Sequence, residues 1–251
     1  MDLLNKVCIV TGGAKGIGRN IVEAFCKEGA RLCIWDLDLK ALNALAQTLT
    51  DNNSIKDKII TQKVDVTQPH EIRKAIITIL QTFGTIHVLV NNVGLYTIDD
   101  ITKEEENSWN KIIDTNLKSV FLCVKATLPT MIENRYGKIV NISSISGKKE
   151  SIFASPSYCA SKAGIIGLTR CIAAQLAKYN INVNCIAPAI TDTDIISILD
   201  NSQIANAVKS IPLGRIGKPE DISNAALFLV KDNSNFITGE TLNVNGGSFM
   251  E

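Results

Sequence analysis

Short apolar runs alternate with longer stretches of helical periodicity along nearly the whole of this 251-residue chain. Seven of the runs are rich in Val and Ile, and their largely continuous apolar character is typical of strands covered on both faces of a parallel sheet. These runs lie at residues 7–10, 32–35, 59–64, 86–90, 138–142, 181–186 and 241–244. The pattern therefore predicts seven buried strands.

The segments between these runs carry apolar residues at the 3.6-residue spacing of helices. The clearest example contains Ile72, Ala75, Ile76, Ile79, Leu80 and Phe83. Strands separated by helices imply right-handed crossovers, so we expect an α/β fold with a doubly wound, seven-stranded parallel sheet and helices on both faces. Two domains are possible at this length, but no linker or repeat divides the chain, which favours one.

Ligands of such a sheet bind outside the carboxyl ends of its strands, and the first strand ends in the sequence TGGAKGIG, residues 11–18. Gly12 permits a tight turn, Gly16 lets the backbone approach a pyrophosphate, and Gly18 allows close helix packing. The N-terminus of the following helix offers free N–H groups to the anion. Any strand-to-helix turn can use glycines, so this motif alone is weak evidence for a dinucleotide site.

The end of the second strand supports the dinucleotide interpretation and bears on the choice of cofactor. Asp36 follows Gly18 by eighteen residues and can accept hydrogen bonds from the adenosine ribose hydroxyls. A carboxylate repels a 2′-phosphate and so favours NAD over NADP, whereas Lys15 in the glycine loop favours NADP. We give Asp36 more weight, although it could instead be a turn or helix-capping residue.

Two further strand ends carry polar groups that could face the cofactor. Asp65 and Val66 follow the third strand, where the carboxylate could meet the adenine amino group or form a turn. The fourth strand ends in NNVG, in which Asn92 and Gly94 could order the backbone beside the cofactor. We interpret both as structural positions first and contact positions second.

Charge and cysteine content narrow the class of protein. Lys and Arg number 26 against 25 Asp and Glu, which gives no reason to expect a nucleic-acid or membrane partner. The seven cysteines form no C-x-x-C pair and are interpreted as reduced, buried thiols. Residues 1–10 resemble neither a signal peptide nor a membrane span, so a cytoplasmic location is expected.

A tyrosine and a lysine four residues apart follow a Ser-Pro-Ser turn signal in the stretch SPSYCASKAG. On spacing alone, Tyr158 and Lys162 could be an interface aromatic and a surface charge on one helix face. Ser143 and Ser144, however, end the fifth strand at the edge that also carries the glycine loop. We therefore expect hydroxyl, phenol and ammonium to meet at the predicted cofactor pocket.

Taken together in order, these motifs resemble the short-chain dehydrogenase/reductase family over essentially the whole chain. The matching positions are Thr11, Gly12, Gly16, Gly18, Asn91, Asn92, Gly94, Asn116, Ser144, Tyr158, Lys162 and Pro188 to Thr193. The resemblance implies one Rossmann domain over residues 1–251, with 1–110 mainly binding the dinucleotide and 111–251 supplying catalytic residues, a substrate lid and oligomer contacts. It also implies a homotetramer.

The resemblance assigns the site residues as well. Asn116, Ser144, Tyr158 and Lys162 are the implied catalytic set, and metal is not expected. The implied cofactor contacts are Gly12, Lys15, Gly16, Ile17, Gly18, Asp36, Asp65, Val66, Asn92, Gly94, Tyr158, Lys162, Pro188, Ile190 and Thr193.

The chemistry of this set can be argued physically. Hydride transfer between an alcohol carbon and nicotinamide needs a group that removes or returns the hydroxyl proton, and the ordinary pKa of tyrosine is about 10. Lys162 and the oxidised nicotinamide could lower it, Ser144 could hold the substrate oxygen, and Asn116 could hold a relay water. We hypothesise an NAD-dependent enzyme acting on a secondary alcohol or ketone.

The chain departs from the family pattern in two places. The spacing from Ser144 to Tyr158 is about one residue longer than usual, and Pro188-Ala189 replaces Pro-Gly, so that backbone must avoid positive φ or accept strain. Residues 192–210, with apolar Ile195, Ile196, Ile198 and Leu199, are expected to form a mobile lid or to pack on the domain. The expected pocket wall is Leu95, Tyr96, Ile145, Lys148, Phe153 and Ile195, with Lys148 more simply a solvated charge.

Three other functions remain open. An NADPH-dependent 3-oxoacyl-acyl-carrier-protein reductase would dock an acidic carrier on basic residues; Arg135 matches one such position, whereas Tyr179, beside Lys178, occupies the other. A catalytically silent NAD-binding sensor is a second possibility. A metal-dependent dehydrogenase is disfavoured because His70 and His87 share no ligand spacing with a cysteine.

Overall fold

The computed structural model describes residues 1–53, 58–151, 154–194, 196 and 200–251. Its centre is one sheet of seven strands in the order β3-β2-β1-β4-β5-β6-β7, and all neighbouring strands run parallel. The strands are β1 (Val7–Thr11), β2 (Arg31–Asp36), β3 (Ile59–Lys63), β4 (Val88–Asn91), β5 (Gly137–Ile142), β6 (Ile181–Pro188) and β7 (Thr241–Val244). The predicted fold class and all seven strands are confirmed, with small shifts at the strand ends.

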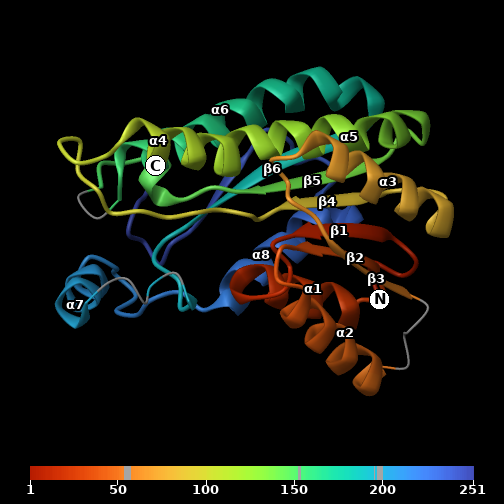
Figure 1. The fold of residues 1–251 in the computed structure, drawn as a ribbon, viewed down its shortest axis with the longest axis horizontal. Coiled ribbons are helices and arrows are strands. Elements are labelled where there is room, and N and C mark those ends of the chain that lie inside the picture. The colour runs from red at the N-terminus through yellow and green to blue at the C-terminus, as the bar shows by residue number, and fades with distance from the viewer. Residues whose placement is uncertain (54–57, 152–153, 195, 197–199) are drawn as a thin grey trace.

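Helices cover both faces of the sheet, as Figure 1 shows. One face carries α1 (Gly16–Lys27), α2 (Leu39–Asn53) and α8 (Pro219–Val230). The other carries α3 (Pro69–Phe83), α4 (Glu106–Ile113), the π-helical turn η2 (Asp114–Lys118), α5 (Ser119–Glu133) and α6 (Pro156–Leu176). The shorter helices are η3 (Ile145–Gly147), η4 (Ala177–Tyr179), α7 (Asn201–Lys209) and η6 (Asp232–Ser234). Each face of the sheet therefore has its own apolar core.

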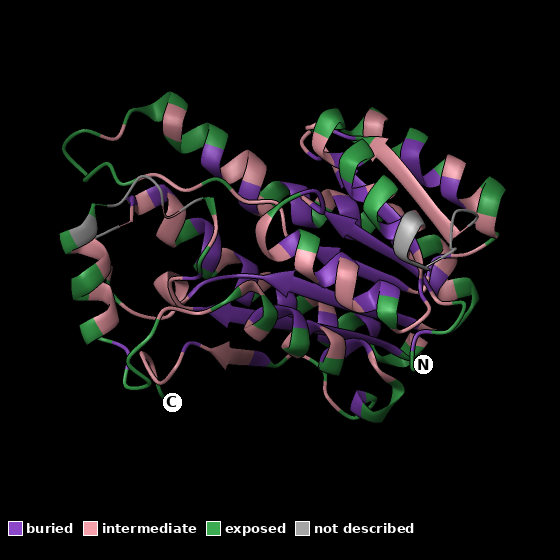
Figure 2. Ribbon diagram, turned by 90° about the horizontal axis from the view of Figure 1, so that it is seen from below, coloured by how far each residue is buried: buried purple, intermediate pink, exposed green. Residues whose placement is uncertain are grey.

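The third strand departs from the prediction of strands buried on both faces. β1, β4, β5 and β6 are buried along their whole length. In β3 the first four residues are half-buried and the last is exposed. Within the described part of the chain β3 pairs only with β2, and it lies at the edge of the sheet. Its Val and Ile content reflects strand propensity, and burial depends on neighbours that an edge strand lacks. The buried centre of the sheet is visible in Figure 2.

Helix α6 begins where the Ser-Pro-Ser signal predicts. The Ser155 hydroxyl is the N-cap and accepts the Tyr158 backbone N–H at 3.2 Å, while Pro156 occupies the first helical position. A serine cap stabilises a helix start by about 1 kcal/mol, and proline there costs no hydrogen bond because that N–H lacks a helical partner. This local chemistry fixes Tyr158 in the first turn of α6, facing the end of β5.

The chain reverses its direction of winding between β1 and β4. From β1 it builds outward to β2 and β3, then returns to the other side of β1 and builds outward from β4 to β7. The loops that leave β1 and β4 therefore diverge, and such a switch point opens a crevice at the carboxyl ends of the strands. A cavity of about 1140 Å³ lies there.

The remaining features concern composition. None of the described helices is long and apolar enough to cross a bilayer. None of the seven cysteines forms a disulfide, and five of them are buried. Cys159 is half-buried and Cys171 is exposed, so the expectation of buried thiols is wrong for these two. His87 is structural, because its Nδ1 accepts the backbone N–H of Val7 at 2.9 Å.

Candidate active site

The cavity at the switch point gathers most of the predicted site residues. Those that line it are Gly12, Lys15, Gly16, Ile17, Asp36, Asp65, Val66, Asn92, Gly94, Ser144, Tyr158, Lys162, Pro188, Ile190 and Thr193. Two predicted residues, Gly18 and Asn116, do not line it. Several lining residues were missed from the contact list, among them Ser143, Thr191, Asp194, Gln203, Ala207 and Ser248.

The glycine loop has the backbone geometry that the sequence predicts. Gly12 and Gly16 have φ of 61° and 53°, in the left-handed region that favours glycine. A Cβ on Gly18 would lie 2.0 Å from the carbonyl oxygen of Gly12, so this glycine serves the packing of α1 and not direct contact with a ligand. Helix α1 begins at Gly16 and directs its N-terminus at the cavity. The loop therefore fits a pyrophosphate.

The ends of β1 and β4 are bound to each other through Thr11 and Asn92. The Asn92 side-chain amide donates to the carbonyls of Thr11 and Gly12, both at 3.1 Å. The Thr11 hydroxyl accepts the backbone N–H of Asn92 at 3.0 Å. Asn92 thus holds the glycine loop in place, which agrees with the interpretation of NNVG as structural first.

Asp36 is a turn residue that also lines the cavity. Its two carboxylate oxygens accept the backbone N–H groups of Ala14 and Asp38, each at 3.1 Å, so it does form the turn after β2. A carboxylate can accept about four hydrogen bonds, so capacity remains for a ligand in the cavity that it lines. Lys15 is paired with Asp38 at 2.7 Å at the same rim.

Asp65 is likewise a turn residue at the cavity wall. Its Oδ1 accepts the backbone N–H of Thr67 at 2.9 Å and the Thr67 hydroxyl at 2.7 Å. With Val66 it lines the part of the cavity next to Asp36 and Leu37. These residues form one end of a continuous site that extends past the glycine loop to Tyr158.

Ser144, Tyr158 and Lys162 meet at the other end, as predicted. The Ser144 hydroxyl accepts the backbone N–H of Ser146 at 3.1 Å and is hydrogen-bonded to the Tyr158 phenol. The Lys162 ammonium donates to the carbonyl of Ile142 at 2.9 Å and lies 5.6 Å from the centroid of the Tyr158 ring. Tyr96 packs edge-on against Tyr158, with ring centroids 4.9 Å apart.

Burial dominates the electrostatics of this group. It raises the pKa of Tyr158 to about 12, although the hydrogen bond from Ser144 acts in the opposite direction. Burial also lowers the pKa of Lys162 to about 8. Among the protein's own groups, the effect of burial on the pKa of Tyr158 is therefore larger than that of the neighbouring side chains. A pKa lowered by Lys162 together with the oxidised nicotinamide stays a prediction, because it includes the charge of the bound cofactor.

Asn116 lies behind the cavity. It is fully buried, and its amide exchanges two hydrogen bonds with the backbone of Leu95, at 2.8 and 2.9 Å. It also donates to the Ser161 hydroxyl at 3.1 Å. Asn116 sits in the π-helical turn η2, a distortion often found at functional sites. These hydrogen bonds anchor the loop after β4, and Ser161 is a partner that the sequence analysis missed.

The lysine pair after Ser144 corrects one prediction. The Lys148 side chain is only 4 % exposed; its ammonium pairs with Glu251 and donates to Asn243 Oδ1 at 2.9 Å. Lys149 donates to the carbonyl of Ser248 at 2.7 Å. Lys148 is therefore not a solvated charge, because residues distant in sequence cover it, and Lys149 rather than Lys148 lines the cavity.

Gly147 fixes where the turn after Ser144 packs. A Cβ on this residue would lie 2.6 Å from both the Lys162 carbonyl carbon and the Ala163 nitrogen. Only glycine allows η3 to approach the backbone of α6 this closely. The contact sets the distance between the Ser144 turn and the helix that carries Tyr158 and Lys162.

The loop after β6 avoids strain at the Pro188-Ala189 departure. In the described chain, positive φ outside glycine occurs at Asn5, Arg135 and Asn180, so Ala189 avoids the left-handed region. Beyond this loop, Ile196, Gln203, Ala207, Ser210 and Ile211 line the cavity, which places α7 in its wall. Of the other residues predicted for the lid and the wall, Phe153, Ile195, Ile198 and Leu199 lie outside the described residues.

Comparisons with known proteins agree with this geometry. A family profile described as enoyl-(acyl carrier protein) reductase, of the short-chain alcohol dehydrogenase type, matches residues 12–248. The chain belongs to the short-chain dehydrogenase/reductase family. It is therefore an oxidoreductase that binds a nicotinamide cofactor.

Individual relatives share one description. The 3-oxoacyl-[acyl-carrier-protein] reductase FabG of Chlamydia muridarum is 40 % identical over 245 residues, 98 % of each chain. The Escherichia coli protein of the same name is 35 % identical over 250 residues and all of both chains. A Brucella melitensis 3-oxoacyl-[acyl-carrier protein] reductase solved with bound NAD superposes with a TM-score of 0.92 at 31 % identity, covering 100 % of this chain and 93 % of that one.

Proposed function

We propose that this short-chain dehydrogenase/reductase reduces the ketone of a 3-oxoacyl thioester, carried on an acyl carrier protein, to the 3-hydroxy product. The names of the relatives support this substrate over a generic secondary alcohol, which the sequence analysis had favoured. The observation that carries the proposal is the position of the Tyr158 phenol, which lies beside the Ser144 hydroxyl and has the Lys162 ammonium 5.6 Å from its ring centroid, because a protonated phenol held there can donate to a ketone oxygen. Ketone reduction needs such a donor.

The side chains divide the work of this reduction. The bound reduced nicotinamide supplies the hydride that adds to the carbonyl carbon. The Ser144 hydroxyl donates a hydrogen bond to the carbonyl oxygen, and the Tyr158 O–H gives its proton to that oxygen as it becomes an alcohol. Lys162, held by the Ile142 carbonyl, places a positive charge beside the phenol and stabilises the phenolate left behind. Proton return from solvent restores Tyr158.

The remaining predicted residues take positioning roles in this proposal. Gly12, Gly16 and the N-terminus of α1 hold the pyrophosphate, and Asp36 accepts the adenosine ribose hydroxyls. Asn116 orders the loop after β4 and the neighbouring Ser161. Apolar Leu95, Tyr96, Ile145 and Ile196 line the same cavity and offer an acyl chain a water-poor wall. In this proposal residues 1–110 mainly bind the nucleotide, while residues 111–251 supply the acid and share the substrate wall with Leu95 and Tyr96.

We expect Tyr158→Phe to lower kcat for reduction of a 3-oxoacyl thioester at least ~10³-fold, because the proton donor is lost while the ring remains. The loss of reduced-nicotinamide absorbance measures turnover. Binding of the nucleotide, followed by its fluorescence, should change by less than about threefold. The matched control is Tyr136→Phe. The Tyr136 hydroxyl donates to Asp232 at the amino ends of the strands, away from the cavity. Retained turnover in Tyr158→Phe would contradict the proposal, and binding without wild-type turnover would favour the sensor.

The two directions of the reaction should respond differently to pH. Burial raises the pKa of Tyr158 to about 12, so the phenolate that alcohol oxidation requires is scarce at neutral pH and becomes more abundant as pH rises. Oxidation of a 3-hydroxyacyl thioester should therefore accelerate between pH 7 and 10, up to ~10-fold per unit. Reduction should stay level and then decline above pH about 8, where Lys162 loses its charge. A reduction rate that rises with pH across this range would oppose these roles.

We propose NAD(H) as the preferred cofactor because the Asp36 carboxylate faces the cavity where a 2′-phosphate would lie. NADH should bind at least ~10-fold more tightly than NADPH, and Asp36→Ala should erase most of that difference. Lys15→Ala is the opposing variant and should weaken NADPH binding without affecting NADH. Titration of both nucleotides by fluorescence decides the matter. A wild-type preference for NADPH would show that Lys15 outweighs Asp36.

We also propose a homotetramer that pairs the faces formed by α4, α5 and α6. Trp109 and Phe121 are 39 % and 48 % exposed on these helices. Arg135 precedes β5 while Ser144 follows it. The basic residue expected to dock a carrier therefore lies at the amino ends of the strands, and the cavity lies at their carboxyl ends. A carrier on Arg135 would serve a neighbouring subunit's cavity more readily than its own.

Light scattering should give about four times the 27.2 kDa chain mass. Phe121→Glu should lower the mass by placing a charge in the pairing face. Phe236→Glu changes a fully exposed side chain outside these helices and serves as the control for surface charge. A monomeric wild type would refute the proposal.

A further inference from the structure

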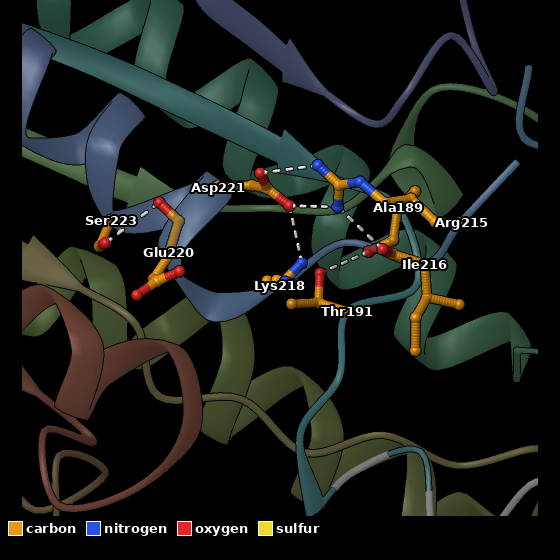
Figure 3. Close-up of polar contacts among 8 residues, drawn as sticks. All are labelled: Ala189, Thr191, Arg215, Ile216, Lys218, Glu220, Asp221 and Ser223. Carbon is orange, nitrogen blue, oxygen red and sulfur yellow. Dashed lines mark hydrogen bonds and ion pairs between the residues drawn. The ribbon is translucent and has the colours of Figure 1, made fainter. Parts of the chain in front are cut away.

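An arginine fork lies at the N-terminus of α8, outside the group of predicted site residues. The two terminal nitrogens of Arg215 donate to the two carboxylate oxygens of Asp221, at 2.7 and 3.0 Å. Arg215 also donates to the carbonyl of Ile216 at 3.0 Å, and Asp221 accepts the backbone N–H of Lys218 at 2.7 Å. Figure 3 shows these groups converging on one carboxylate. The segment from 215 to 218 is thereby fixed to the first turn of α8.

The segment fixed in this way is paired with the loop after β6. The Gly217 N–H donates to the carbonyl of Ile190 at 2.9 Å, and the Asp192 N–H donates to the carbonyl of Gly217 at 2.8 Å. These bonds form a parallel bridge between Thr191 and Gly217. The excursion that carries α7 thus leaves and returns at one point, and Arg215 lies beside that point.

Helix α8 is in turn bound to the helix of the glycine loop. The Ser223 hydroxyl donates to the Asn20 side-chain oxygen at 2.6 Å, which joins α8 to α1. The apolar side chains of both helices belong to one buried core. Because α1 begins at Gly16, α8 has a fixed position relative to the pyrophosphate end of the cavity.

The loop after β6 contacts the same glycine. Ile190, Thr191 and Thr193 line the cavity, and a Cβ on Gly16 would lie 3.2 Å from the Thr193 methyl carbon. The position of this wall relative to the glycine loop is therefore set from two sides: directly at Thr193, and through Gly217, α8 and α1.

We infer that the Arg215–Asp221 pair is a positioning element that couples the glycine-loop helix to the cavity wall after β6. With the pair intact, residues 190–193 are held against the nucleotide and α7 is held over the substrate space. Without it, the bridge at Gly217 loses its support, and the cavity opens on the side of residues 190–193. Arg215 and Asp221 touch neither cofactor nor substrate in this role.

The exposure of the pair distinguishes this role from simple stabilisation. The side chains of Arg215 and Asp221 are 49 % and 32 % exposed. Ion pairs this exposed to solvent contribute little to folding. An effect of breaking the pair should therefore appear in binding and not in the melting temperature. Arg19–Glu23 on α1 is a nearly identical pair by exposure, at 48 % and 32 %, and neither of its residues lines the cavity.

The test is a titration of NADH and NADPH against the wild type, Arg215→Ala, Asp221→Asn and the double variant. We expect Arg215→Ala to raise the dissociation constant of the preferred nucleotide about fivefold or more. The double variant should be no weaker than Arg215→Ala, because both changes break one interaction. Arg19→Ala should leave the dissociation constant within about twofold, in line with surface substitutions generally.

A kinetic measurement rests in addition on the proposed 3-oxoacyl reduction. Arg215→Ala should raise KM for the thioester while kcat at saturation stays within about twofold, since the Ser144, Tyr158 and Lys162 groups are untouched. If the wild type turns over no 3-oxoacyl thioester, the proposed function fails, but the nucleotide titration still decides the role of the pair. Unchanged nucleotide affinity in Arg215→Ala, an equal loss in Arg19→Ala, or a large fall in melting temperature would each overturn the inference.

Discussion

The bond between the ends of β1 and β4 is the constraint on which the whole site depends. Asn92 holds the carbonyls of Thr11 and Gly12, and Thr11 returns the contact by accepting the Asn92 N–H. Thr11 and Asn92 lie 81 residues apart in the chain, but β1 and β4 are neighbours in the sheet, on the two sides of the winding reversal. Their loops can diverge into a cavity only because the strand ends themselves are held together. The glycine loop, Asp36 on one side and Ser144 on the other are all placed relative to this junction.

Burial rather than charge governs the chemistry at the far end of the cavity. The same apolar surroundings raise the pKa of Tyr158 and lower that of Lys162. In both residues burial thus favours the uncharged form of the side chain. The phenol therefore keeps its proton at neutral pH, which is the form that can donate to a ketone oxygen. The relatives are named reductases.

The cavity is held by contacts that converge from distant parts of the chain. Gly147 lets the Ser144 turn pack closely on α6, and Lys148 binds that turn to β7. Gly217 pairs the loop after β6 with the segment before α8. Each contact fixes one wall relative to an adjacent element. The spacing of the few reacting groups thus depends on contacts made by residues, such as Gly147, Lys148 and Gly217, that take no chemical part in the reaction.

The sequence by itself determined the alternation of strands and helices, the glycine turn and the start of α6 at Ser155, because periodicity, positive φ at glycine and helix capping are local properties. It also placed Ser144 at the carboxyl ends of the strands, since parallel strands end together, and Tyr158 and Lys162 at the start of the helix that follows. Only the tertiary structure decided that β3 is an edge strand, that Lys148 is covered, that Asn116 lies behind the cavity and that Arg215 supports its wall. Each of these depends on which distant segment becomes a neighbour, and packing of the whole chain sets those neighbours.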